Sequence, residues 1–354
     1  VYAIQESREL PQTAFGYCGP EEPTARTLWD TFKNAKEYGS ILQPKVTLEE
    51  LDKLEARLQE ADSMAGYGSL GVQGLTYQLL DVMYPLIDQA RMLVQKYDVV
   101  VTNPPYMGSS GMSARLSDYV KKVYPDSKSD LFAVFIEHGN EMVKRAGFNC
   151  MVTMQSWMFL SSFEKMRVNA LQTKTITNLM HMENMVMGIA FGTAVTVFQN
   201  VAVHGYKGTY NQIKLQDIEN DVPKQFPIQG NRFAQVSTDN FSKIPGSPVA
   251  YWATNRLMKD FEDGVSLSSY AEPKQGMATM DNNKYLRRWY EVEIGKCCFH
   301  AQSLGDAKES GKRWFPYNKG GDYRKWYGNF CYLVNWEKDG EQLKADATEL
   351  YGSY

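Results

Sequence analysis

The sequence predicts a doubly wound α/β domain followed by a smaller mixed α/β domain. Between residues 98 and 203, short apolar runs typical of strands alternate with helical patterns across short connections. The 354 residues are 43% hydrophobic and 13% aromatic, which is enough to form a substantial core. After about residue 245 the helical periodicity fades, and Trp, Tyr, Lys and Arg accumulate.

The first part of the chain is expected to be helical. A short helix is predicted over 29–37, and a charged helix over 47–61 has Leu48, Leu51, Leu54 and Leu58 on one face. Thr47 with Glu50 three residues later is typical of a capping box. A Gly/Ser-rich loop over 66–74 should precede a longer helix over 76–96.

Strands and helices then alternate. The run 98–102 predicts a short buried strand of a parallel sheet, followed by a flexible polar loop over 107–113. Asp130 should cap a helix with apolar residues at helical spacing that ends near Gly147. Strands over 150–154, 175–180 and 193–203 follow, with a helix over 162–172 and a glycine-containing loop over 188–192.

The strand at 98–102 leads directly into Asn103-Pro104-Pro105-Tyr106. Ligands of open α/β sheets bind just beyond the carboxyl ends of the strands. Two prolines fix φ and remove two N–H groups, so the turn presents an Asn amide oxygen and a proline carbonyl beside an aromatic ring. The alternative interpretation is a proline-terminated strand and a plain surface turn.

This set of groups suits methylation of an exocyclic amine. The Asn103 side chain and the Pro104 carbonyl could accept the two amine hydrogens and favour a tetrahedral, nucleophilic nitrogen. Tyr106 would stack on the flat group that carries the amine. The methyl donor would be the sulfonium of S-adenosylmethionine, which requires no metal.

Two further residues have both a structural and a functional interpretation. Phe191 is either a core residue or a second aromatic ring that faces Tyr106 around a flipped base. Asp130 is either a helix cap or a ligand contact. The four histidines lack metal-ligand spacing, and the five cysteines lack any C-x-x-C pair, so the sequence predicts neither a metal site nor a disulfide framework.

The region 284–325 is rich in cations interleaved with aromatic residues. Such a composition suits nucleic-acid binding, and it also occurs on ordinary solvated surfaces laced with salt bridges. The candidate DNA-binding residues are Arg287, Arg288, Arg324 and Lys325. Pro245-Gly246-Ser247-Pro248 predicts a linker, with a catalytic domain over 1–247 and the start of a target-recognition domain over 248–354.

Bulk properties exclude little. The net charge of −3 provides no global basic field, although a local basic cleft could still bind DNA. No apolar stretch approaches a membrane span and no signal peptide is evident, so a cytoplasmic protein with reduced thiols is expected. The chain begins at Val1 without an initiator Met, which suggests an excised fragment.

The motif and the strings around it resemble the gamma-class amino-methyltransferases that make N6-methyladenine in DNA. The resemblance is closest to the adenine methyltransferase family of BREX phage-resistance systems, PglX, and it covers essentially the whole chain. It rests on "YDVVVTNPPYMG", "SDLFAVFIEHG", "FGTAVTVFQN", "IPGSPVAYWATNRL", "KQGMATMDNNKYLRRWYEV" and "RWFPYNKGGDYRKWYGN".

This resemblance implies a Rossmann-like methyltransferase sheet that acts on double-stranded DNA, with other phage-defence proteins as possible partners. It implies that Asn103, Pro104, Pro105 and Tyr106 form the catalytic motif. It further implies that Phe191 stacks on the flipped base and that Asp130 and Phe132 line the adenine pocket.

The chain departs from the family in two places. Met280 stands where members usually have Gly, in a loop at the entry to the recognition domain. The glycine-rich cofactor signature and its acidic partner are absent upstream of Asn103, so the cofactor-binding residues are not identified and the sheet is expected to lack its N-terminal strands. On this basis the chain is expected to bind S-adenosylmethionine weakly or not at all.

Other functions remain open at this point. The same motif serves methyltransferases that act on RNA or on protein glutamine, and a non-catalytic DNA-recognition subunit could retain it as scaffold. The long aromatic and basic C-terminal region argues against a protein substrate.

Overall fold

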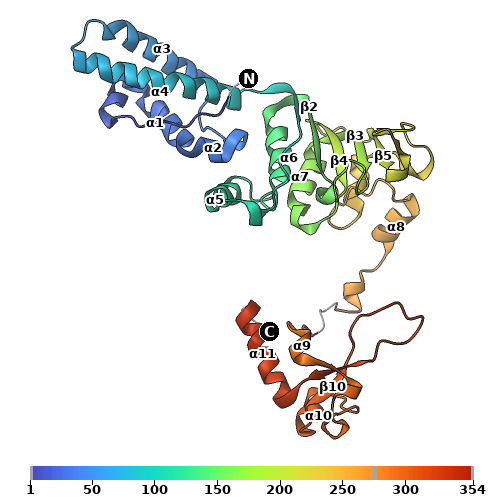
Figure 1. Ribbon diagram of the computed structural model, residues 1–354. Helices are drawn as coiled ribbons and strands as arrows, with labels where there is room; N and C mark the ends of the chain where they lie inside the picture. Colours follow the sequence, from blue (N-terminus) through green and yellow to red (C-terminus); the bar gives the residue numbers. More distant parts are fainter. Residues whose placement is uncertain (1–2, 273–276, 352–354) are drawn as a thin grey trace. The chain divides into compact units, whose positions relative to one another are not determined.

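The computed structural model describes residues 3–272 and 277–351. It divides into two compact units, Val1–Val265 and Ser266–Tyr354 (Figure 1). No helix among the described residues is long and apolar enough to cross a membrane.

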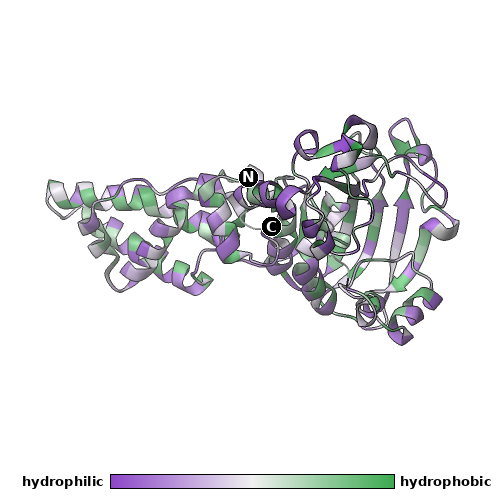
Figure 2. Ribbon diagram, turned by 90° about the horizontal axis from the view of Figure 1, so that it is seen from below, coloured by the Kyte–Doolittle hydropathy of each residue, from purple (hydrophilic) through white to green (hydrophobic). Residues whose placement is uncertain are grey.

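The first unit begins with a helical region that has its own apolar core. Its helices are α1 (Glu22–Thr31), α2 (Ala35–Tyr38), α3 (Leu48–Ala65) and α4 (Leu70–Val94). Thr47 and Glu50 form the predicted capping box at the start of α3. The hydrophobic and hydrophilic residues of these helices are interspersed as amphipathic segments require (Figure 2).

Two helix predictions in this region were wrong in extent. The helix expected over 29–37 is interrupted, because a short 3₁₀ segment over Phe32–Asn34 separates α1 from α2. The long helix starts at Leu70 rather than at residue 76 and includes Gly71 and Gly74. Burial of Leu79, Met83 and Leu86 in the helical core outweighs the low helix propensity of those glycines.

The rest of the first unit is built on a six-stranded mixed sheet with the order β1-β2-β4-β3-β5-β8. The β1/β2 and β3/β5 pairs are parallel, and the other pairs are antiparallel, so β4 and β8 oppose the remaining four strands. The α/β class is therefore confirmed. The strands are β1 (Tyr97–Thr102), β2 (Val143–Met154), β3 (Thr175–Met182), β4 (Thr193–Gln199), β5 (Lys207–Ile213) and β8 (Phe233–Ser237).

Two helices, α6 (Leu131–Met142) and α7 (Glu164–Thr173), pack on the sheet, and α5 (Ala114–Val123) precedes them. The expectation that strand 98–102 is buried was wrong. β1 lies at the edge of the sheet and pairs with β2 alone among the described strands, which leaves Val99 53% and Val101 71% exposed. β2 also begins at Val143, so Gly147 lies within the strand and does not end the preceding helix.

The segment expected to be a linker at 245–248 is anchored to the first unit. Val249 and Tyr251 are buried in the sheet core, and the buried Arg167 donates to the carbonyls of Gly246 and Ser247. The chain continues through α8 (Asn255–Asp263), and the boundary between the compact units falls after Val265 rather than at 247.

The second unit contains a three-stranded antiparallel sheet with the order β10-β11-β9. Its core joins Tyr285, Phe315, Val334, Trp336 and Leu343. The elements are α9 (Asn282–Tyr285), β9 (Leu286–Arg288), α10 (Leu304–Glu309), β10 (Trp314–Tyr317), β11 (Tyr332–Asn335) and α11 (Glu337–Tyr351).

Candidate active site

The Asn103–Tyr106 corner lies at the carboxyl edge of the sheet. β1 ends at Thr102, and its parallel partner β2 ends at the same edge. Pro104 is buried, whereas Asn103 and Pro105 are exposed. The sequence therefore folds into a rigid turn that keeps the Asn103 amide accessible at the position where α/β sheets bind ligands.

Tyr106 is fixed by its hydroxyl. The Tyr106 hydroxyl lies 3.1 Å from the carbonyl oxygen of Val152 on β2 and 3.2 Å from the Asn103 Oδ1, and both can accept its single hydrogen. A tyrosine hydroxyl is protonated and can donate at neutral pH, and burial raises the pKa of Tyr106 further. The hydroxyl thereby holds the ring against the sheet and restrains the Asn103 side chain.

Asp130 braces the corner from the start of α6. Its carboxylate accepts from the backbone N–H of Met107 at 3.0 Å and from that of Phe132 at 3.3 Å. The Leu131 N–H donates to the Met107 carbonyl at 3.0 Å, so the two segments are joined in both directions. Asp130 is thus the predicted helix cap, and it also fixes the chain immediately after Tyr106. Burial raises its pKa against the lowering effect of these backbone donors.

Phe132 supports Tyr106 from within the core. Its side chain has 0% exposure, and its ring lies 6.3 Å from that of Tyr106 at an interplanar angle of 86°. It also packs on Phe163 at 5.3 Å. In this conformation Phe132 offers no surface to a ligand, so its contribution is to position the Tyr106 ring.

Phe191 meets Tyr106, although the two residues are far apart in the sequence. β4 runs antiparallel to both β2 and β3, and Thr193 pairs with Met154 and with Met182. The residues just before β4 therefore lie at the same edge as the ends of β1, β2 and β3. The Phe191 and Tyr106 rings have centroids 5.6 Å apart and an interplanar angle of 73°.

This aromatic pair is closed. A base held between two parallel rings needs a ring separation of about twice the ~3.4 Å spacing of stacked bases. The edge-to-face contact of Tyr106 and Phe191 leaves no such gap. Stacking on both faces of a base therefore requires Phe191 to move away from Tyr106.

A polar chain lies beneath the Phe191 loop and was not predicted from the sequence. The buried His181 ring contacts the Gln155 amide oxygen through Nε2 and the Tyr251 hydroxyl through Nδ1 at 3.0 Å. A Cβ at Gly192 would lie 2.4 Å from the Gln155 side chain, so a larger residue there would displace the Gln155 amide that contacts His181. Burial lowers the pKa of His181. The histidine showed no motif spacing in the sequence because its partners come from separate segments.

The four candidate DNA-binding cations differ in how far they are engaged. Arg287 is half-buried, and its guanidinium donates to the carbonyls of Asn283 at 2.6 Å and Leu286 at 2.7 Å. Arg288 is exposed and donates to the Tyr290 hydroxyl at 2.6 Å. Arg324 and Lys325 are exposed in the connection between β10 and β11. Arg287 is therefore bound to its own unit, whereas the other three reach solvent.

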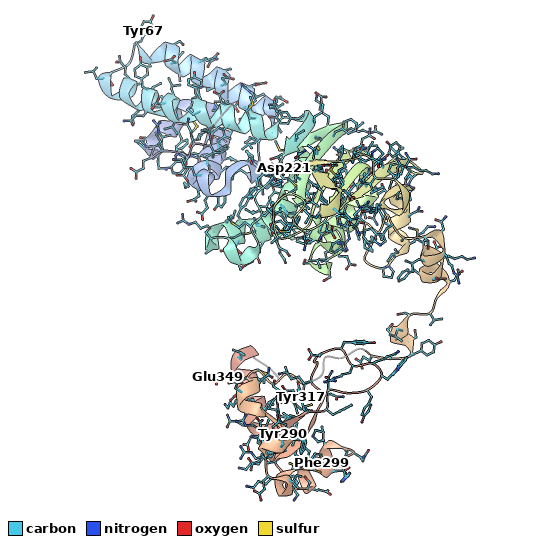
Figure 3. The ribbon with its side chains drawn as sticks, turned by 45° about the vertical axis from the view of Figure 1, so that its right-hand side comes forward. Tyr67, Asp221, Tyr290, Phe299, Tyr317 and Glu349 are labelled. Atoms are coloured by element: carbon cyan, nitrogen blue, oxygen red, sulfur yellow. The ribbon has the colours of Figure 1, made fainter. Side chains whose placement is uncertain are left out.

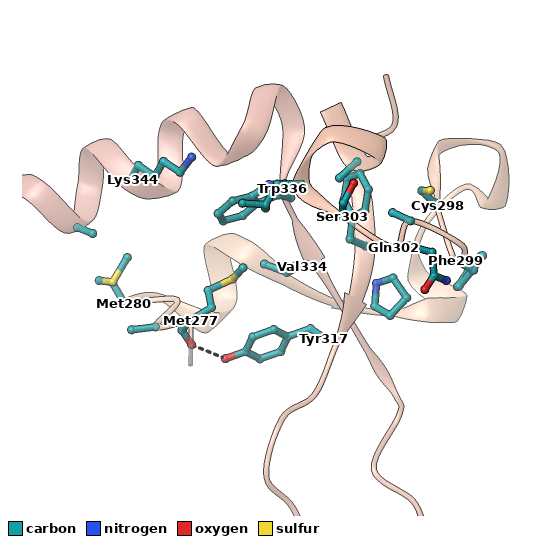
Figure 4. Close-up of a pocket in the computed structure, with 17 residues that line it drawn as sticks. Met277, Met280, Cys298, Phe299, Gln302, Ser303, Tyr317, Val334, Trp336 and Lys344 are labelled. Atoms are coloured by element: carbon teal, nitrogen blue, oxygen red, sulfur yellow. Dashed lines mark hydrogen bonds between the residues drawn. The ribbon is translucent and has the colours of Figure 1, made fainter. Parts of the chain in front are cut away.

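The second unit holds a cavity of about 1250 Å³ beside α11 (Figure 4). Its lining is mostly apolar and includes Met277, Met280 and Trp336, with Lys344 on the helix above. The Tyr317 hydroxyl donates to the Met277 carbonyl at 3.1 Å. Met280 has φ +50°, in the left-handed region that favours glycine.

Metal-ligating side chains do not gather at the corner. Within residues 3–272 and 277–351, no three His, Cys, Asp or Glu side chains lie close enough together to hold a metal ion. The polar groups at the corner are instead oxygen acceptors, which suit a donor such as an amine.

Comparison with known proteins identifies the family. Residues 24–186 match the family model of the Eco57I restriction-modification methylase. The adenine-specific methyltransferase BrxX of Escherichia coli O9:H4 (strain HS) is 38% identical over 90% of the chain. The adenine-specific methyltransferase PglX of Lacticaseibacillus casei (strain Zhang) is 37% identical over 75% of the chain. The chain belongs to the PglX family.

The alignments with the PglX relatives cover most of this chain but only a small part of each relative. The chain spans 26% of the length of the Escherichia coli relative and 23% of that of the Lacticaseibacillus casei relative. Among solved structures, a modification subunit of a putative type I restriction enzyme from Vibrio vulnificus YJ016 is 12% identical, with a TM-score of 0.36, over 64% of this chain and 54% of that chain. Membership of the PglX family rests on the sequence relatives.

Proposed function

We propose that the Asn103–Tyr106 corner is the methyl-transfer centre of a DNA adenine N6-methyltransferase that acts in phage defence. The contact between Tyr106 and Phe191 carries this proposal. Two aromatic rings from different segments meet at the carboxyl edge of the sheet, directly beside an accessible Asn amide. A flipped base needs this combination of ring faces and edge-directed acceptors.

In this proposal, Asn103 and Pro104 orient the amino group of the target adenine. The Asn103 Oδ1 would accept one amine hydrogen with its second lone pair while the Tyr106 hydroxyl keeps the amide in place, and the Pro104 carbonyl would accept the other. Both acceptors draw the nitrogen lone pair out of conjugation with the ring. S-adenosylmethionine, when bound, supplies the methyl group that this nitrogen attacks.

The described residues include groups that could bind the adenine amino group. The exposed Asn103 amide and the Tyr106 hydroxyl, which is protonated at neutral pH, provide an acceptor and a donor. No described residue is assigned to the adenosine or methionine part of the donor. Double-stranded DNA is the proposed substrate, with the exposed cations Arg288, Arg324 and Lys325 as phosphate contacts.

The test is Asn103→Ala in the intact protein, expressed in cells that lack the wild-type gene. N6-methyladenine should fall by about 100-fold or more, as when one transition-state hydrogen bond is removed from an enzyme. DNA binding by the purified variant should be retained. Asn255→Ala, at an exposed position on α8, is the control.

Several outcomes would assign another function. Unchanged adenine methylation in Asn103→Ala would remove the proposed role of this residue. A wild-type protein that binds DNA but leaves adenine unmodified would be a recognition subunit. Methylation found in RNA or at a protein glutamine would change the substrate.

A further inference from the structure

The connection between β10 and β11 carries a group of exposed aromatic side chains. It spans residues 318–331 and extends from the small sheet of the second unit as a long loop, drawn in dark red in Figure 1. Tyr323 is 87% exposed, Trp326 is 91% exposed and Tyr327 is 80% exposed. Several large aromatic side chains gathered on one exposed loop are typical of a binding surface.

The loop backbone holds these rings away from the core. Trp326 has φ +74°, a left-handed conformation that is uncommon for a bulky residue, although glycines occur at several positions of the same loop. The Asn329 side-chain amide donates to the Asp322 carbonyl at 3.2 Å and so closes the loop on itself. A Cβ at Gly328 would lie 2.7 Å from the Arg324 Cγ, so the stem of Arg324 lies directly on the backbone.

Cations are interleaved with the rings. Lys319, Arg324 and Lys325 lie in the loop, and Asp322 is its only acidic residue in the sequence. The Lys325 ammonium lies 5.5 Å from the centre of the Trp326 ring, and the Lys319 ammonium lies 5.3 Å from that of Tyr332. A surface with exposed rings and an excess of positive charge suits a polyanion that also presents flat faces.

The surface continues onto the neighbouring strand. β9 pairs with β11, and the Trp289 N–H donates to the Cys331 carbonyl at 3.1 Å at the base of the loop. Trp289 is 51% exposed and Tyr290, labelled in Figure 3, is 58% exposed. With Arg288 beside them, these side chains extend the aromatic and basic surface beyond the loop.

We propose that the 318–331 loop binds DNA by stacking aromatic rings, above all Trp326, on bases, while Arg324 and Lys325 contact phosphates. This inference rests on the proposed function for DNA as the partner, and it adds a contact that does not depend on charge. Every base has a flat face, so such stacking tolerates any sequence and is strongest where bases are unpaired. An enzyme that extrudes an adenine creates unpaired bases in its own substrate.

The test compares Trp326→Ala, the double variant Arg324→Gln/Lys325→Gln and Tyr67→Ala in the intact protein. Tyr67 is the control because its side chain is 95% exposed but no cation is near it in the sequence (Figure 3). The segment between Arg57 and Arg91, which contains Tyr67, has no Lys or Arg. The probe is a fluorescein-labelled mixed-sequence duplex with a central unpaired adenine. Its affinity is measured by anisotropy over a series of potassium chloride concentrations.

Trp326→Ala should weaken binding about ten-fold at every salt concentration, as expected when one base–aromatic stack is lost. The slope of log affinity against log salt should not change. Arg324→Gln/Lys325→Gln should instead lower that slope by about two, because two phosphate contacts are lost. Tyr67→Ala should bind like the wild type, and thermal unfolding should show that all variants are folded.

Wild-type affinity in Trp326→Ala, or an equal loss in Tyr67→Ala, would overturn the inference. A Trp326→Ala variant with a reduced salt slope would also overturn it, because the ring would then act through charge. A different pair of results would show that the proposed function is wrong while the DNA-binding role of the loop is right. The wild type would leave adenine unmethylated, while the ten-fold effect of Trp326→Ala on DNA affinity would remain.

Discussion

The Phe191 ring meets the Tyr106 ring edge to face, with 5.6 Å between their centroids. Phe191 belongs to a short loop that precedes β4, and Tyr106 follows β1, so the contact joins two loops at the same edge of the sheet. Gly188 in the same loop has φ +71°, a conformation that glycine adopts without strain. The two rings are in contact in this conformation. Under the proposed function, a base would stack between them only after Phe191 moves away from Tyr106.

Phe191→Ala should remove the ring contact with Tyr106 and weaken binding of the base. We expect the KM for DNA to rise about ten-fold, the loss expected for one base–aromatic stack, while kcat changes less. Phe191→Trp should restore most of the affinity because it supplies another ring. Initial rates of methyl transfer over a range of DNA concentrations measure both constants.

Phe261→Ala, at an exposed position on α8, is the matched control and should behave like the wild type. If Phe191→Ala changed neither constant, Phe191 would be a packing residue with no part in base binding.

Tyr106→Phe should separate the ring from its hydroxyl. The variant keeps the contacts with Phe132 and Phe191 but loses the hydroxyl shared by Asn103 and Val152. We expect kcat to fall about ten-fold, because the Asn103 amide loses its restraint and misplacement of an acceptor slows the reaction. Unfolding free energy should fall by only about 1 kcal/mol, the usual cost of one hydrogen bond.

Urea unfolding and methyl-transfer rates measured on the same preparations test this separation. Tyr206→Phe, at a 43% exposed position, controls for the loss of a hydroxyl elsewhere. A kcat equal to that of the wild type would show that the hydroxyl has no role in positioning Asn103.

The sequence was most informative where local chemistry sets the structure. The Thr47 capping box, the Asp130 cap and the turn after Thr102 all formed as predicted, because each depends on residues within a few positions of one another. The proximity of Phe191 and Tyr106 was one of two interpretations of Phe191, and the local sequence did not decide between them. The physical reason for it is the antiparallel direction of β4, which periodicity does not reveal.

Tertiary features were harder to predict. The run 98–102 is as apolar as a central strand, yet Val99 and Val101 are exposed because β1 lies at the sheet edge. Pro245 and Gly246 are typical linker residues, yet Arg167 binds this segment from a helix far away in the sequence. His181 lies in an ordinary strand pattern, and its partners come from two other segments. Such contacts are determined by packing in three dimensions.

His138 should make the protein less stable in mild acid. It is buried on α6, and its Nδ1 lies 3.0 Å from the Tyr124 hydroxyl. Burial lowers the pKa of His138 to about 4 from 6.5. Between these values the unfolded chain binds the proton and the folded protein does not, so the free energy of unfolding falls as pH decreases, by roughly 3 kcal/mol in total.

The measurement is urea unfolding of the wild type and of His138→Gln at pH 7 and pH 4.5. The wild type should lose more stability between these two pH values than the variant, which has no group to titrate at this position. Glu137 and Glu141 line the same cavity as His138, and burial raises both of their pKa values, which acts in the opposite direction. They are present in both proteins, so the difference isolates the histidine. Equal losses would contradict the assignment.

Arg167 anchors the segment around Gly246 to the sheet region. It is 1% exposed, and its guanidinium donates to the carbonyls of Trp157 at 2.8 Å, Leu160 at 2.9 Å and Ser247 at 3.0 Å. It also donates to the Gly246 carbonyl. A lysine ammonium has no planar fork and cannot reach these separate acceptors together. Arg167→Lys should therefore leave buried carbonyls unpaired and lower the free energy of unfolding by about 3 kcal/mol.

Arg167→Lys should also loosen the chain locally, around Gly246 and Ser247. Release of the Gly246–Ser247 carbonyls should expose the chain after Lys243, so limited digestion with trypsin should cut there faster in Arg167→Lys than in the wild type. Arg256→Lys, at an exposed position on α8, should change neither the stability nor the rate of cleavage. Unchanged cleavage after Lys243 together with wild-type stability would show that the segment is held by Val249 and Tyr251 in the core, and that the arginine contacts are incidental.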